Sequence, residues 1–233
     1  MKNKLTLFLI IFLLAELSFQ SHLFAAIVLD NYEEVIAMVN EGQTPIVPVK
    51  FSEEKYEIVK HDIQVSVVSK EKIDEVFKEI KSMGEYFQFK KYVGGCESRA
   101  LEMARLLDQK NLKSIKVFVI QKLFYRDVGW NYHVAPILFV VENNQINPYV
   151  IDPMLDSSGP ILLLSWYSKV GKEFFEPSYF TSRYVFLEKD IDLELSDYRK
   201  EDIEKAQSVL EALKKVSPNG KGMGDFIMRI LNR

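Results

Sequence analysis

The alternation of apolar and polar residues predicts several helices. Two stretches, 71–84 and 96–109, space their apolar residues three and four positions apart, which is typical of a helix buried along one face. The buried stripes are Ile73, Val76, Phe77 and Ile80 in the first helix and Ala100, Met103, Ala104 and Leu107 in the second. Capping residues and charge patterns predict a short helix over 31–42 and a charged amphipathic helix over 198–215.

Stretches rich in Val, Ile, Phe and Tyr predict strands. They are residues 63–68, 115–121, 132–141, 149–152 and 183–188. Helices therefore precede a run of neighbouring strands and another helix follows, an order that favours an α+β fold with a mostly antiparallel sheet. We expect residues 27–68 to form a small N-terminal lobe, and residues 69–233 to form the main domain.

The first 26 residues have the three-part build of a secretory signal peptide. Lys2 and Lys4 precede an apolar run over 5–15, and the stretch ends in small residues at 25–26. The apolar run is short for a membrane span, although an uncleaved anchor stays open as an alternative. The sequence therefore predicts a secreted or periplasmic protein.

Composition and charge narrow the classes of partner. The chain has 233 residues, of which 48% are hydrophobic, enough for a buried core. Removal of Lys2, Lys4 and Glu16 with the signal takes away one net positive charge, so the formal charge changes from −3 to about −4. A mildly acidic chain without a basic stripe argues against nucleic acid as a partner.

The single cysteine lies in the segment GGCES, at the predicted start of a helix. Gly94 and Gly95 allow a tight turn and close backbone approach before Cys96. A helix N-terminus presents unpaired N–H groups and partial positive charge, which lower the pKa of a thiol and can hold an oxyanion. The alternative is that Cys96 is a small, packed apolar residue.

A reactive thiol needs a base, and the chain beyond residue 26 offers His61 and His133. His61 lies in a polar stretch and is expected at the surface. His133 heads an apolar strand and is expected to point inward, where it needs a hydrogen-bond partner. A core histidine bonded to a backbone carbonyl is the alternative.

Asp152 ends the strand that follows His133. Because strands joined by a short turn normally pair, the antiparallel return brings Asp152 beside the start of the His133 strand. Asp152 would then hold the imidazole in one tautomer and stabilise its protonated form. An aspartate that caps the turn before Pro153 is the alternative. Together, Cys96, His133 and Asp152 suggest a catalytic triad.

Three segments resemble the bacterial protein glutaminases, a family that deamidates glutamine side chains within proteins. The segments are GGCESRALEMARLL, GWNYHVAPILFV and YVIDPMLDSSGP, followed by Trp166. The resemblance spans residues 71–166 and implies a transglutaminase-like, papain-related fold in which a helix carrying the nucleophile packs on the sheet. It makes Cys96 the nucleophile, His133 the base and Asp152 the orienting acid. Known members carry an inhibitory pro-segment, so residues 27–68 are a candidate for a shortened one.

The implied reaction releases ammonia from glutamine through a thioester and needs no metal or cofactor. Trp130, Tyr132 and Gly95 are candidates for lining the glutamine slot, although the two aromatic residues could equally serve core packing. A transglutaminase or a cysteine peptidase with the same triad, and a non-catalytic binding or inhibitor module on this fold, stay open. The disulfides of known members have no counterpart within a chain that has one cysteine.

Overall fold

A computed structural model describes residues 27–28, 31–51, 63–83, 94–125, 128–171 and 178–215. Its helices are α2 (Tyr32–Asn40), α3 (Lys70–Ser82), α4 (Cys96–Gln109), α5 (Leu163–Val170) and α6 (Lys200–Lys215), with a 3-10 turn, η2, at Glu188–Asp190. The predicted signal peptide and His61 lie outside the described residues. Within the described residues, no helix is both long and apolar enough to cross a membrane.

Within the described residues, eight strands form one sheet. They are β1 (Ile27–Val28), β2 (Ile46–Phe51), β3 (Ile63–Ser69), β4 (Ile115–Tyr125), β5 (Val128–Glu142), β6 (Gln145–Val150), β7 (Ile161–Leu162) and β8 (Ser178–Ser182). The order is β1-β2-β3-β5-β4-β8, with β6 beside β5 and β7 beside β6. The pair β3–β5 is parallel, and the other described pairs are antiparallel. The prediction of an α+β fold with a mostly antiparallel sheet is confirmed.

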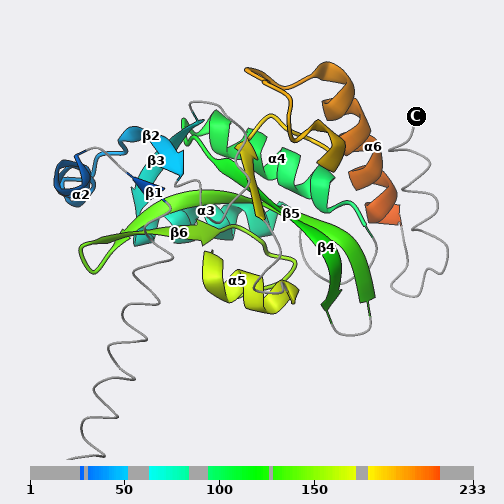
Figure 1. Ribbon diagram of the computed structural model, residues 1–233, viewed down its shortest axis with the longest axis horizontal. Coiled ribbons are helices and arrows are strands. Elements are labelled where there is room, and N and C mark those ends of the chain that lie inside the picture. Colours follow the sequence, from blue (N-terminus) through cyan, green and yellow to red (C-terminus); the bar gives the residue numbers. More distant parts are fainter. Residues whose placement is uncertain are drawn as a thin grey trace, which may run out of the picture.

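Helices cover both faces of the sheet (Figure 1). On one face, α3 and α4 pack against β3 and β5, and α6 packs on α4. On the other face, α5 packs against β4 and β6, and its Trp166 is fully buried. The strand β5 therefore runs between two layers, so consecutive residues of β5 point to different environments. This alternation decides which side of the sheet each functional side chain reaches.

Both strongly amphipathic helices form where the apolar spacing predicts them. The four apolar residues of each predicted stripe are buried in α3 and α4. Ser69 caps α3 by accepting a hydrogen bond from the backbone N–H of Lys72. Gly95, before α4, has φ of 78°, which favours glycine, and a Cβ there would lie 3.1 Å from Val209 and 3.2 Å from Leu213 of α6.

The strand predicted over 183–188 is wrong. The sheet ends at Ser182, the last residue of β8, and the chain then leaves it to pack over α4. Val185 and Phe186 are both buried although they are consecutive, which a half-buried strand does not allow. High β-propensity in this segment reflects burial of large apolar side chains rather than pairing.

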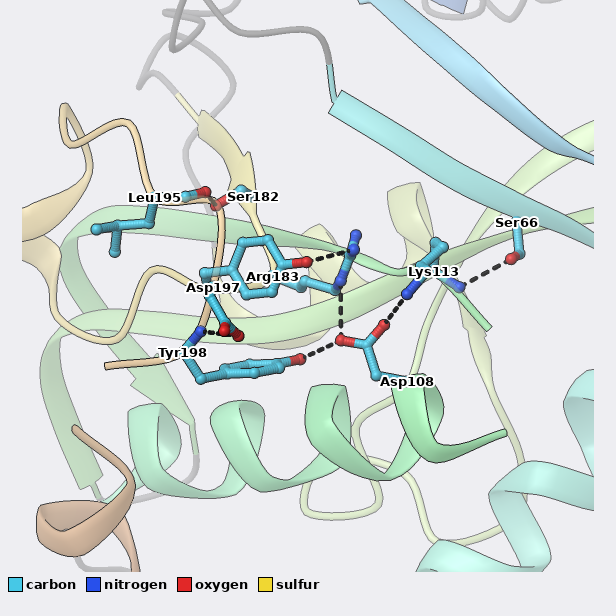
Figure 2. A network of polar contacts seen from close by, with 9 residues as sticks. Ser66, Asp108, Lys113, Ser182, Arg183, Leu195, Asp197 and Tyr198 are labelled. Carbon is cyan, nitrogen blue, oxygen red and sulfur yellow. Dashed lines mark hydrogen bonds and ion pairs between the residues drawn. The ribbon is translucent and has the colours of Figure 1, made fainter. Parts of the chain in front are cut away.

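A polar network at the end of α4 holds this C-terminal segment in place (Figure 2). Asp108 Oδ2 accepts hydrogen bonds from Arg183 Nε at 2.9 Å and from the Tyr198 hydroxyl at 2.6 Å. Its other oxygen accepts from Lys113 Nζ at 2.9 Å. The side chain of Arg183 also lies over the ring of Tyr184. The helix that begins at Cys96 is therefore anchored at its far end to the chain that follows the sheet.

The N-terminal region contributes strands to the same sheet. β2 pairs with β3, and β3 pairs with β5 through Val67 and Phe139. Val65 and Val67 are fully buried in the core that also contains β4 and β5. Part of the predicted lobe, β3, is thus an interior strand of the main sheet, whereas β1 and β2 lie beyond it.

Candidate active site

His133 and Asp152 meet at one end of the sheet. After β6 pairs with β5, the backbone N–H of Ile151 donates to the carbonyl of Pro136, which continues the antiparallel return past the end of the strand. Asp152 is thereby carried alongside β5, and its Oδ2 lies 2.8 Å from His133 Nε2. The exposed fractions are 1% for His133 and 3% for Asp152, so water contributes little to this contact.

Trp166 of α5 completes this buried pair. Its indole Nε1 donates to the same carboxylate oxygen of Asp152 at 2.8 Å. Its ring stacks on the imidazole of His133, with ring centroids 5.5 Å apart and an angle of 23° between the ring planes. Since the tryptophan contacts both partners, it fixes the orientation of the carboxylate and of the imidazole together.

The environment keeps Asp152 ionised. Burial alone would raise the pKa of Asp152, but the charge and hydrogen bond of His133, the hydrogen bond of Trp166 and the charge of Arg99 outweigh it, so the pKa is lowered. Oδ1 of Asp152 also accepts a hydrogen bond from the backbone N–H of Leu155 at 3.4 Å. The aspartate therefore has the turn role that its place before a proline suggests, and it contacts the histidine as well.

Cys96 lies at the first position of α4, on the sheet face opposite α5. The thiol is 7% exposed and packs among Ala100, Phe118 and Val134. The backbone of Val134, the residue after His133, hydrogen-bonds to the sulfur. The structure thus brings the predicted nucleophile against the strand residue adjacent to the predicted base, at a helix end where the first N–H groups have no intrahelical partner.

The pKa of the Cys96 thiol differs from the sequence-based expectation. Burial raises it well above the ordinary value, and the charge and hydrogen bond of Glu97 raise it further. Arg99 and the backbone of Val134 act in the opposite direction without compensating. The sequence predicts a lowered pKa because the helix N-terminus favours the thiolate. Burial of the sulfur and the neighbouring Glu97 act in the opposite direction and are larger, so that prediction is wrong.

Glu97 is the direct partner of the thiol. The Cys96 sulfur donates to Glu97 Oε2 at 3.2 Å, and the hydroxyl of Tyr132 donates to the same oxygen at 3.1 Å. Asp152 is bonded to Nε2 of His133, so Nδ1 is the ring nitrogen on the side away from this carboxylate. The thiol itself is hydrogen-bonded to Glu97 in this arrangement.

The three predicted slot residues have different surroundings. Tyr132 is close to Cys96, because its hydroxyl donates to the same Glu97 oxygen as the thiol does. Gly95 provides the left-handed turn that starts α4 and leaves room for α6. Trp130 belongs to β5, but its side chain lies outside the described part of the structure. The role of all three in substrate binding stays a prediction.

Glu97, Arg99 and Trp166 are site residues that reasoning from spacing missed. Arg99 donates to the carbonyl of Gly94 at 2.9 Å and contacts Met154 Sδ at 3.0 Å, so it ties the turn before Cys96 to the segment after Asp152. Nothing in the periodicity distinguishes Glu97 or Arg99 from solvated helix residues. Trp166 is part of the resembling segment, which is the signal that could have placed it in the site.

A family model described as glutaminase matches residues 73–170, which include Cys96, His133, Asp152 and Trp166. Comparison with curated proteins gives no significant match.

Solved structures share the fold. The NMR structure of protein-glutaminase from Chryseobacterium proteolyticum has 21% identity and a TM-score of 0.55, and the match covers 67% of this chain and 94% of that chain. A crystal structure of pro-protein-glutaminase has 18% identity and a TM-score of 0.57, and the match covers 82% of this chain and 83% of that chain. The fold is therefore that of the protein-glutaminases, and the segment that matches the glutaminase family model, residues 73–170, contains the candidate site.

Proposed function

We propose that the protein deamidates glutamine side chains of proteins or peptides to glutamate and releases ammonia. The observation that carries this proposal is the buried His133–Asp152–Trp166 arrangement, together with a helix-borne thiol that packs against Val134, the next residue of the same strand; all lie within the segment that matches the glutaminase family model. A histidine held by a buried carboxylate next to a cysteine is the arrangement that nucleophilic amide chemistry requires.

In the first half of the reaction, His133 Nδ1 takes the proton of the Cys96 thiol and the sulfur attacks the γ-carboxamide carbon. Backbone N–H groups at the start of α4, including that of Cys96, stabilise the oxyanion. The protonated imidazole, stabilised by ionised Asp152, gives its proton to the departing nitrogen. Ammonia leaves and a γ-glutamyl thioester on Cys96 remains.

In the second half of the reaction, water attacks the thioester after ammonia has left. His133 takes a proton from the water as its oxygen attacks the thioester carbon, and the C–S bond then breaks. Glutamate forms, and the sulfur regains a proton from the imidazolium. The residues of this chain supply every proton transfer in the cycle, so no cofactor is invoked.

A direct test measures the products on purified protein. Incubation with a glutamine-rich protein is expected to release ammonia and to produce a shift of about 1 Da at individual glutamines by mass spectrometry, as replacement of an amide by an acid requires. Including an alkylamine tests the transglutaminase alternative, because incorporation of the amine at the same sites would identify amine rather than water as the acceptor. Peptide-bond cleavage without ammonia would favour the peptidase alternative and contradict our proposal.

We also infer that the N-terminal segment restrains this activity and that the protein acts outside the cytoplasm. The match to the pro-form crystal structure covers a larger share of this chain than the match to the NMR structure does, 82% against 67%. The start of the chain has the build of a secretion signal. Both observations fit an exported enzyme whose early residues resemble a pro-segment.

Cleavage after folding is expected to raise turnover. A protease site inserted between residues 52 and 62 would separate β1, α2 and β2 from the rest and leave the interior strand β3 in place. We expect the rate of ammonia release to increase by at least about fivefold on cleavage, which is the smallest fold-change that typical coupling free energies between two sites produce. A chain without the inserted site, treated with the same protease, is the control. Equal rates before and after cleavage would contradict an inhibitory role.

A further inference from the structure

The carboxylate of Glu97 is buried beside the nucleophile and only half of its hydrogen-bonding capacity is used. The side chain is 2% exposed. Oε2 accepts from Cys96 and Tyr132, whereas Oε1 is buried and has no hydrogen-bond partner within the described part of the chain. Among the described residues, no lysine or arginine forms an ion pair with Glu97.

Such an arrangement is costly in a folded protein. A buried acceptor without a donor costs about 1–3 kcal/mol, and more when it is charged. A carboxylate oxygen accepts hydrogen bonds, and none of the described residues donates one to Oε1, so this oxygen is suited to a donor brought by a ligand. The oxygen belongs to the residue that directly follows Cys96, and the other oxygen of the same carboxylate contacts the thiol.

The substrate of the proposed reaction supplies a matching donor. A γ-carboxamide carries a carbonyl oxygen, which faces the N–H groups of the helix, and an NH₂ group with two N–H donors on the other side of the attacked carbon. We propose that Glu97 accepts a hydrogen bond from this NH₂ group and so distinguishes glutamine from glutamate. This inference rests on the proposed deamidation.

The same contact separates substrate from product. Ionised glutamate has no donor for Oε1 and places an acceptor oxygen against it, so the product is disfavoured where the substrate is bound. The amide is also the better occupant because a site built to bond an N–H rejects an analogue that lacks it. Glu97 is thus assigned a substrate-recognition role that is separate from proton transfer by His133.

The test compares two substrates that differ in the leaving group. One peptide carries glutamine, and its partner carries the γ-methyl ester of glutamate, which forms the same thioester with release of methanol but has no N–H to offer. For Glu97→Gln we expect kcat/KM on the glutamine peptide to fall by about 10- to 100-fold, in line with loss of a charge-assisted hydrogen bond. Because Glu97 also contacts the thiol, any effect on the sulfur acts on both substrates, so the deciding readout is the ratio of amide to ester kcat/KM, which we expect to fall by about 10- to 100-fold; inhibition by the glutamate peptide should strengthen by about tenfold.

Controls separate recognition from structure. Glu102→Gln, one turn further along α4 where Glu102 pairs with Arg105, should leave the amide-to-ester ratio unchanged. Glu97→Asp keeps the carboxylate but shortens the side chain by one methylene. If Glu97→Gln does not fold, the amide-to-ester ratio of kcat/KM is measured on Glu97→Asp instead. An equal loss on both substrates, or an unchanged ratio, would overturn the inference. Wild-type protein that releases neither ammonia nor methanol would instead overturn the proposed function.

Discussion

Replacing Cys96 by alanine is expected to abolish ammonia release, with kcat falling by at least about 10⁴-fold, as loss of a catalytic nucleophile typically does. In the proposed mechanism the thioester forms on this sulfur, and the chain has no other cysteine to replace it. For the same reason, a thiol-directed alkylating reagent can modify this position alone. Turnover measured by ammonia release, with and without alkylation, checks the prediction.

The control for Cys96 is its neighbour in the same helical turn. Ser98 is fully buried, so Ser98→Ala removes one heavy atom from a comparable place. It should leave kcat within a few fold, because Ser98 has no part in the proposed mechanism. Thermal unfolding of both variants should verify that the fold is kept. Turnover that survives both alkylation and the alanine substitution would exclude a cysteine mechanism.

Substituting Asp152 by asparagine is expected to lower kcat by about 10³- to 10⁴-fold, as in other histidine–carboxylate systems. The carboxylate accepts from both His133 and Trp166 through one oxygen, at 2.8 Å each. An amide cannot stabilise the imidazolium by charge, and its NH₂ group would oppose one of the two donors. The value of kcat, measured from ammonia release for both proteins, checks the prediction.

The variant also changes the pH dependence of stability. The folded-state pKa of Asp152 lies below its ordinary value, so the ionised carboxylate contributes stability that is present above the unfolded pKa and is lost as the pH falls through the folded one. The stability difference between wild type and Asp152→Asn, measured by chemical denaturation, should therefore shrink on acidification. Asp156→Asn, four residues further on and paired with Lys169 at 3.1 Å, is the matched control and should keep full activity. A loss in kcat of less than tenfold for Asp152→Asn would contradict the role of this residue.

Sequence reasoning located the helices and the His–Asp pair because both follow from local rules. The stripe of α4 and the glycine before it define where the helix begins, and hence where Cys96 lies. The short turn between β5 and β6 forces an antiparallel return, which brings Asp152 back to His133. These inferences need only periodicity and chain connectivity.

Other parts of the site depend on contacts between segments far apart in the sequence. Trp166 reaches Asp152 because α5 packs on the sheet face opposite α4, and no local pattern fixes that face. The carboxylate of Glu97 is buried by surrounding chain, although its place in the first helical turn resembles that of a solvated acid. The segment after Ser182 was mistaken for a strand because buried apolar residues look alike whether they pair or pack.

The parallel pairing of β3 with β5 affects the order of events during synthesis. Val67 lies beside Phe139, so the middle of the sheet cannot close until β5 has left the ribosome. Contacts between distant residues form slowly because a long loop must be ordered before they are made. A nascent chain of this design stays unassembled for longer, which is the state that a translocation channel accepts. If residues 1–26 direct export, the segments that carry Cys96 and His133 assemble only after the chain has crossed the membrane. The cytoplasmic proteins of the cell that makes the enzyme are then separated from it.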